Sequence, residues 1–190
     1  MKPLPILETS RLRLRPLELA DAPQIQELFA RWEIVRHLAN VVPWPYPPDG
    51  AEQFIRHVAL PAIQRGDEWI WTLRLRDDPP RVIGSIGLKR GEVKNRGFWM
   101  GQRWQGRGLM SEAADAVTDY WFDVLGFEVL RVPKAVANTA SRRISARGGM
   151  RVIATMERDY VSGRLPSEVW EITAAEWRAR RQRRAAGGPE

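Results

Sequence analysis

The segment GQRWQGRGLMSEA, residues 101–113, concentrates groups that can hold an anion. It follows an apolar run and leads into residues with helical spacing, so the first amides of that helix would lack partners. Glycine at Gly106 and Gly108 lets a phosphate approach the main chain. The helix dipole and the guanidinium groups of Arg103 and Arg107 add positive charge. The segment therefore predicts a site for the diphosphate of a cofactor.

Two nucleotide-binding patterns compete for this segment. The P-loop pattern G-x-x-x-x-G-K-[ST] is nearly spelled by GQRWQGRG, but Arg107 replaces the lysine and Gly108 replaces the hydroxyl that binds magnesium. The dinucleotide pattern G-x-G-x-x-G fails at Ser111, and the segment follows expected hairpins rather than a βαβ unit. Both patterns are set aside.

A third interpretation is an acyl-coenzyme A site. Residues 105–110, QGRGLM, resemble the Q/R-x-x-G-x-G/A loop with which the GNAT superfamily of N-acetyltransferases binds the pyrophosphate of coenzyme A. Residues 138–150, NTASRRISARGGM, resemble the N-x-x-S-x-x-V-x-E-K-x-G-F segment of the RimJ/RimL branch (ribosomal-protein-alanine N-acetyltransferase-like). The segments ETSRLRLRPLELADAP, IGSIGL, GFWMG and EVWEITAAEW are also similar to that branch, so the resemblance covers nearly the whole chain.

The resemblance implies acetyl-CoA as cosubstrate and a set of residues that bind it. A backbone amide around Trp99–Gly101 would stabilise the oxyanion, and the Asn138 side chain would hold the pantetheine amide. Arg142, Arg143 and Arg147 would reach the nucleotide end, or else remain solvent-exposed. The cofactor-binding residues expected are Trp99, Met100, Gly101, Gln105, Gly106, Arg107, Gly108, Leu109, Met110, Asn138, Ser141 and Arg143.

Acetyl transfer also needs groups that move protons. Ser145 stands where many GNAT enzymes have a tyrosine that acts as general acid. The resemblance therefore favours Ser141 as proton donor to the thiolate, with a helix-capping role as the alternative. Asn95 stands where related enzymes often have a glutamate just before the strand expected at 97–101. The general base is therefore expected to be Glu92, or a water molecule relays the proton. Asp159 and Glu33 are further carboxylates near the expected cleft.

The acceptor pocket is expected at the Pro-rich loop VVPWPYPP between the first two helices. Trp32, His37, Trp44 and Tyr46 would line it, although simple packing also explains each of them. The resemblance favours the α-amine of a protein or peptide N-terminus, attacked directly in a ternary complex. A small amine (a polyamine, an amino acid or an antibiotic) stays open as acceptor, and so does a module that binds coenzyme A without catalysis.

Hydrophobic periodicity supplies the elements that would position these groups. Strands are expected at 11–16, 69–75, 81–88, 97–101, 129–137, 150–161 and 167–173, with 162–166 as a turn, and helices at 21–32, 51–64, 110–124 and 139–149. The fold class is therefore mixed α/β. The resemblance implies a mostly antiparallel, twisted sheet of about seven strands flanked by helices, with strands 97–101 and 129–137 splayed apart. Pro133 suits a strand that lacks a neighbour on one side.

Composition limits the remaining possibilities. The chain has 190 residues, a net charge of +7 and no cysteine, which excludes disulfides and a cysteine nucleophile. With only two histidines, no histidine-based metal site is expected. A single domain is expected over residues 1–177, followed by a basic tail, 178–190. The tail is expected to be a solvated helix end, with contact to nucleic acid or the ribosome as the alternative. No bilayer-spanning run or secretory signal is present, so a cytoplasmic protein is expected, and a homodimer is permitted.

Overall fold

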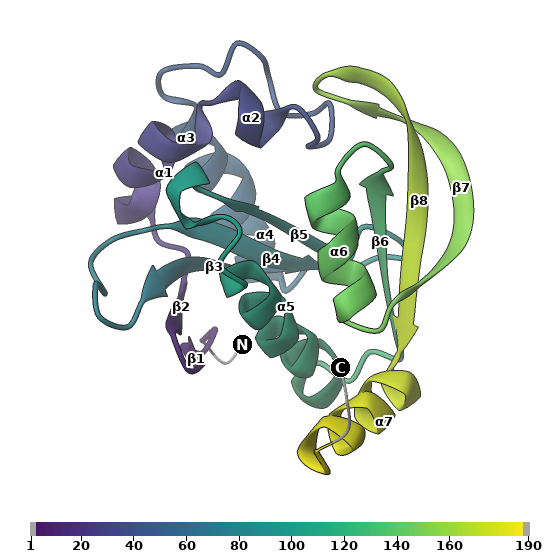
Figure 1. The fold of residues 1–190 in the computed structure, drawn as a ribbon. Coiled ribbons are helices and arrows are strands. Elements are labelled where there is room, and N and C mark those ends of the chain that lie inside the picture. The colour runs from purple at the N-terminus through teal and green to yellow at the C-terminus, as the bar shows by residue number, and fades with distance from the viewer. Residues whose placement is uncertain (1–2, 188–190) are drawn as a thin grey trace.

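The computed structural model describes residues 3–187 and divides the strands between two antiparallel sheets (Figure 1). The first sheet contains, in spatial order, β1 (Leu7–Glu8), β2 (Leu12–Pro16), β3 (Glu68–Leu75), β4 (Gly84–Lys89) and β5 (Arg96–Met100). The second contains β6 (Val129–Ala135), β8 (Gly163–Thr173) and β7 (Arg151–Tyr160). The expected mixed α/β architecture with antiparallel sheets is confirmed.

Helices cover both faces of the five-stranded sheet and flank the smaller sheet (Figure 1). A π-helical turn, Ile55–Ala59, joins α3 to α4, and a second one, Tyr120–Val124, extends α5, so each forms one continuous helical segment. The α-helices are α1 (Ala22–Phe29), α2 (Trp32–Val35), α3 (Gly50–Phe54), α4 (Leu60–Arg65), α5 (Leu109–Asp119), α6 (Thr139–Arg147) and α7 (Ala174–Ala185). Short 3-10 turns occupy Leu19–Asp21 and Gln102–Trp104.

The two faces of β3 belong to two cores, as alternation along a strand requires. Trp69, Trp71 and Leu73 pack into the larger core with α5 and the smaller sheet, whereas Ile70 packs with α1 and α3. Leu12 and Leu14 of β2 are fully buried, as their period-two spacing predicts. The central strands are thus fixed from both sides, which gives β5 a rigid support.

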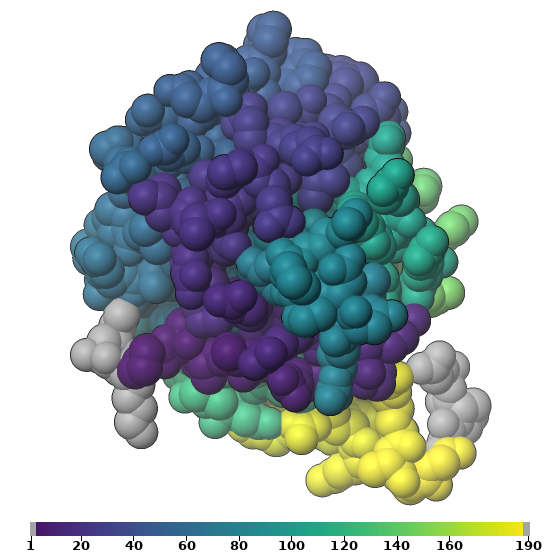
Figure 2. Space-filling model, turned by 90° about the vertical axis from the view of Figure 1, so that its left-hand side faces the viewer, coloured from purple at the N-terminus to yellow at the C-terminus, as the bar shows by residue number. Residues whose placement is uncertain are grey.

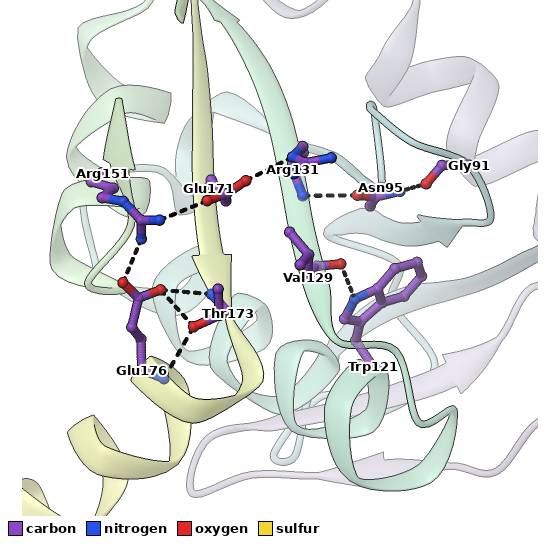
Figure 3. A network of polar contacts seen from close by, with 9 residues as sticks. All are labelled: Gly91, Asn95, Trp121, Val129, Arg131, Arg151, Glu171, Thr173 and Glu176. Carbon is purple, nitrogen blue, oxygen red and sulfur yellow. Dashed lines mark hydrogen bonds and ion pairs between the residues drawn. The ribbon is translucent and has the colours of Figure 1, made fainter. Parts of the chain in front are cut away.

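Among the described residues, hydrogen bonds join the facing edges of the two sheets at one place, where Asn95 precedes β5 and Arg131 lies in β6. The Asn95 amide donates to the Arg131 carbonyl, and the Arg131 amide donates to Asn95 Oδ1, both at 2.8 Å (Figure 3). Beyond this junction the described parts of the two strands share no ladder, so they diverge. Val136 donates to the Pro166 carbonyl, and the alternation of an antiparallel ladder then turns the Pro133 nitrogen away from β8 and into the gap. The expected splay and the rationale for Pro133 agree with this geometry.

Three boundaries differ from the sequence-based expectation by three residues or more. The first helix ends at Phe29, because Ala30 leaves the helical region, and Trp32 begins α2 instead. The strand expected from residue 81 begins at Gly84. The turn expected at 162–166 is wrong: Tyr160 pairs with Gly163, so the hairpin has a two-residue loop, and its ladder continues through Pro166.

Within residues 3–187 the structure holds no helix long and apolar enough to cross a bilayer. In the same part of the chain, no cluster of three or more acidic or histidine side chains could hold a metal ion.

Candidate active site

A cleft of about 500 Å³ opens where β5 and β6 diverge. Its walls come from β5, the glycine-rich segment, β6, the start of α6 and the residues that follow α2. The lining contains most of the expected cofactor residues: Trp99, Met100, Gln105, Gly106, Arg107, Gly108, Leu109, Met110, Asn138, Ser141 and Arg143. Segments far apart in the sequence therefore converge on one cavity, as the resemblance implied.

The glycine-rich segment presents a row of unpaired amides to this cleft. The Gln105 amide donates to the Gln102 carbonyl, and the Glu112 amide donates to the Gly108 carbonyl. Between them, the amides of residues 106–111 have no hydrogen-bond partner in the part of the chain that the structure describes. Gly106 and Gly108 have φ angles of 76° and 75°, a conformation that residues with a side chain rarely adopt. The segment is shaped to hold an anion at the N-terminus of α5.

A polar clamp holds this segment against the N-terminal hairpin. Arg11 donates from Nη1 to the Arg107 carbonyl (2.9 Å) and from Nε to the Glu112 carboxylate (2.7 Å). Thr9 and Ser10 also donate to Glu112. Burial alone would raise the pKa of Glu112, but the hydrogen bonds from Thr9, Arg11 and Ser10 together lower it. Glu112 is therefore a charged anchor for the loop.

The edge of β5 offers main-chain groups to the gap at alternate residues. Gly101 donates its amide to the Ile83 carbonyl, so the register turns Trp99 toward β4 and turns Phe98 and Met100 toward β6. The Met100 carbonyl accepts a hydrogen bond from Gln105 Nε2 at 2.8 Å, which agrees with this assignment. Met100 is thus the residue of Trp99–Gly101 whose amide faces the cleft. Gly101 lies outside the cleft lining.

At the start of α6, the residue that caps the helix is Asn138 and not Ser141. Asn138 caps the helix, because its Oδ1 accepts from the Ser141 amide at 3.1 Å. Ser141 is therefore not the capping residue, and its hydroxyl instead accepts a hydrogen bond from Lys134 Nζ at 2.6 Å. Arg143 and Arg147 line the cleft, whereas Arg142 forms two hydrogen bonds of 2.8 Å with Glu168.

Lys134 is a cleft-lining residue that no sequence motif predicted. It lines the cleft yet is only 6% exposed, because it continues the buried face of β6 formed by Leu130 and Val132. Burial and the neighbouring Arg96 lower the pKa of Lys134 well below the ordinary value for lysine. A lysine in period-two register with buried apolar residues was the signal that could have revealed it.

Arg96 places a second buried cation beside Lys134. Its guanidinium donates to Thr118 Oγ1 at 2.7 Å and contacts Met150 Sδ, and burial lowers its pKa to about 10 against the opposing influence of Asp115. Among the described residues neither Arg96 nor Lys134 forms an ion pair with a carboxylate. The closed end of the gap therefore holds two buried basic groups with no carboxylate paired to them in the described part of the chain.

The candidates for the general base lie at different places. Glu92 is exposed in the turn between β4 and β5 and does not line the cleft. Glu33 and His37 do line it. Burial and the neighbouring charge of Arg36 lower the pKa of His37, so its imidazole is neutral at pH 7. Ser145, at the position of the expected tyrosine, is fully buried without a hydrogen-bond partner among the described residues.

Of the expected acceptor residues, only His37 reaches the cleft lining. Trp32 and Trp44 lie beside each other with ring centres 5.4 Å apart and remain 39% and 43% exposed. Tyr46 packs edge-on against Phe29, and burial raises its pKa to about 12. Tyr46 thus supports the loop, and the two tryptophans form an exposed aromatic surface.

A larger hollow of about 650 Å³ lies on the other side of Trp104. It is bordered by α1, residues 78–82 and residues 101–104, on the face where purple N-terminal segments meet teal ones (Figure 2). The row of unpaired amides and the buried lysine line the smaller cleft instead. The smaller cleft is therefore the candidate active site.

Comparison with known proteins agrees with this geometry. An acetyltransferase (GNAT) domain matches residues 11–151. The chain belongs to the GNAT acetyltransferase family. The uncharacterized N-acetyltransferase YoaA of Bacillus subtilis (strain 168) is 31% identical over 156 residues, which cover 76% of this chain and 82% of YoaA. The chain is accordingly an acetyl-CoA-dependent N-acetyltransferase.

Two solved structures share the GNAT fold. The ribosomal-protein-S5-alanine acetyltransferase of Vibrio fischeri has a TM-score of 0.76 and 14% identity, with 91% of this chain and 98% of that chain covered. RimL, a ribosomal L7/L12 α-N-protein acetyltransferase in complex with coenzyme A, has a TM-score of 0.75 and 17% identity, with 89% and 98% covered. At these identities the likeness shows the fold, and the RimJ/RimL-like branch expected from the sequence is consistent with it.

Proposed function

We propose that this GNAT acetyltransferase transfers an acetyl group to the α-amine of a protein or peptide N-terminus. The observation that carries the proposal is the exposed pair Trp32 and Trp44, of which Trp32 directly precedes the cleft-lining residue Glu33, together with Val41, which is 84% exposed. Such an apolar surface outside a small reaction site suits an acceptor with a chain behind its amine. A small amine would fill the cleft and leave this surface unused.

In this proposal the phosphates of acetyl-CoA bind to the unpaired amides of residues 106–111, assisted by Arg107 and Arg143. The pantetheine arm lies in the gap between β5 and β6, where main-chain groups of Phe98 and Met100 face it. The Met100 amide donates to the thioester oxygen as negative charge develops there. These residues fit the cosubstrate because their free donors match its phosphates and carbonyl.

Proton movements accompany the transfer. Neutral His37 accepts a proton from the acceptor ammonium, and the free amine then attacks the thioester carbon. A C–N bond forms, the C–S bond breaks, and Ser141 donates a proton to the departing thiolate. The amine nitrogen loses a second proton as the amide forms, and this proton passes to water. Glu33, in the same lining, attracts the acceptor's positive charge.

The test is thiol release from acetyl-CoA with a panel of amines. Free N-terminal peptides should give turnover, and mass spectrometry should place the acetyl group on the N-terminal fragment. Matched peptides with a blocked N-terminus and a free lysine side chain are the control and should give none.

Two other outcomes carry different conclusions. Turnover with polyamines, amino acids or aminoglycosides and none with peptides would replace the proposed acceptor by a small amine. Binding of acetyl-CoA by calorimetry with no turnover on any amine would indicate a module that holds coenzyme A without catalysis.

A further inference from the structure

Lys134 and Ser141 form a hydrogen-bonded pair in the lining of the cleft. Lys134 Nζ lies 2.6 Å from Ser141 Oγ and 4.8 Å from the centre of the Phe98 ring. No carboxylate within the described chain forms an ion pair with Lys134. A buried charge with no partner is costly, so this ammonium gives up a proton more readily than a lysine in solvent.

The direction of the hydrogen bond determines what Ser141 can do. The hydrogen bond runs from Lys134 Nζ to a lone pair of the Ser141 oxygen, which is the direction that a charged ammonium requires because it has only donors. The hydroxyl proton of Ser141 then points elsewhere, and no acceptor for it exists among the described residues. Since Ser141 lines the cleft, its proton faces the space where the thioester would lie.

We propose that Lys134 is the positioning residue that keeps Ser141 oriented as a proton donor and returns a proton to it after each transfer. The inference rests on the proposed function, because it concerns the same thiolate. Ser141 Oγ–H gives its proton to the sulfur as the C–S bond breaks, and Lys134 gives one proton to Ser141. Water then returns a proton to Lys134, so both side chains end the cycle unchanged.

The charged surroundings define the pH range of this role. Arg96 of β5 is a second buried cation, and Glu168 of β8, opposite Lys134 in the ladder, is held by Arg142. Ser167 bonds to the Lys134 carbonyl and to Tyr160, and His37 lines the same cleft. Burial and Arg96 lower the pKa of Lys134, so its charged form exists below that lowered pKa and is lost as pH rises. Turnover should therefore have an alkaline limb well below the ordinary lysine pKa of about 10.4.

Kinetics of four variants test whether Lys134 acts through Ser141. K134M and S141A should each lower kcat by about 100-fold, the low end of the range for general acid catalysis. The double variant should be no slower than S141A, because the two residues act as a unit. K134M should lose the alkaline limb, whereas K134R, charged at every accessible pH, should recover part of kcat and also lack the limb. K89M removes an exposed lysine that pairs with Glu68 and should change nothing.

A second measurement uses the unmodified protein without any substrate. The chain has only four lysines, so selective ¹³C labelling at Cε gives a resolvable spectrum. One resonance should titrate well below the other three, and it should be absent in K134R. This readout stays valid even if K134M fails to fold.

Three results of these experiments would overturn the inference, and the fate of the acetyl group supplies a fourth. These are additive losses in the double variant, an alkaline limb that persists in K134M, and a Lys134 resonance that titrates with the others. An acetyl group found on Ser141 would also overturn it, because Ser141 would then be a nucleophile. Absence of turnover in the unmodified enzyme, with the shifted lysine resonance present, would contradict the proposed function and leave no thiolate for Lys134 to serve.

Discussion

At the scale of single residues, the cleft depends on groups whose charge is set by burial. His37 has a pKa below the ordinary value of about 6.5, because burial and Arg36 both disfavour its charged form. The neutral form, which accepts a proton, is present above that lowered pKa and is lost as pH falls through it. The acid limb of the pH–rate profile should therefore lie below pH 6.5.

The first prediction concerns this limb. H37Q should lower kcat/KM by about 100-fold and remove the acid limb, since glutamine takes no proton. R36Q should move the limb to higher pH, because one cause of the lowered pKa disappears. H57Q, which alters the exposed second histidine, is the control. A pH profile of H37Q identical to that of the parent enzyme would remove His37 from the mechanism.

The second prediction concerns backbone geometry at Gly106. G106A should cost about 1–2 kcal/mol of stability, because φ is 76° there, and it should also raise the KM for acetyl-CoA. G163A is the matched control, since Gly163 has φ of 110° and open space around it but lies in the hairpin between β7 and β8. It should lower the melting temperature and leave the KM unchanged. Equal KM effects in both variants would mean that strain alone, and no loss at the anion site, explains G106A.

At the scale of elements, a buried ion pair joins α1 to the central sheet. Arg74 of β3 lies 2.5 Å from Asp21, with side chains 5% and 7% exposed, and it also donates to the carbonyls of Pro79 and Pro80. R74M should therefore destabilise the fold by about 3–5 kcal/mol in urea unfolding, because it leaves a buried carboxylate unpaired. E52A, which breaks the exposed pair between Glu52 and Arg56, should cost less than about 1 kcal/mol.

The clamp between the N-terminal hairpin and α5 gives a pH-dependent prediction. The pKa of Glu112 is lower in the folded chain than the unfolded value of about 4.3. Its contribution to stability is therefore fully present above that unfolded value and is lost as pH falls through the lower folded value. Chemical unfolding of E112Q should show weaker acid sensitivity than the parent protein. Parallel stability curves would show that Glu112 is not an anchor.

Local pattern was sufficient for most elements and for the conformation of the glycine-rich segment, because alternation, helical spacing and glycine at positive φ are local properties. Leu12 and Leu14, for example, are buried as their spacing predicts. The partner of Ser141 could not be predicted, since the contact with Lys134 depends on how β6 and α6 pack. The sequence could not predict that Glu92 lies outside the cleft lining, for the same reason. The short distance in sequence between Glu92 and β5 does not determine which way the intervening turn faces.

At the scale of the whole molecule, the basic C-terminal segment is folded against an acidic face. Residues Asp115, Asp119 and Asp123 follow each other at helical spacing along α5 and its π turn. They pair with arginines of α7: Arg184 with Asp115 at 2.8 Å, and Arg181 with both Asp119 and Asp123. Trp177 of α7 is buried and donates to Asp119. Much of the tail's charge is thus balanced within the fold.

This arrangement gives the fifth prediction. The triple variant D115N/D119N/D123N should lower the melting temperature at low salt and much less at high salt, because exposed pairs are screened. It should also retain RNA more strongly than the parent chain in a filter assay, since the arginines lose their acidic partners. Strong RNA retention by the parent chain, abolished by removing residues 178–190, would instead support a nucleic-acid role for the tail.

The single junction at Asn95 and Arg131 has a mechanical consequence. Within residues 3–187, Asn95 and Arg131 make the only hydrogen bonds between the facing edges of the two sheets. The amides of Phe98, Met100 and Ala135 therefore lie on open strand edges and should exchange with solvent faster than neighbouring ladder positions. A ligand that carries its own amide groups would form hydrogen bonds with both strand edges and would hold β5 and β6 together. Deuterium uptake at these edges would then report occupancy of the seam directly, before any bond is made or broken.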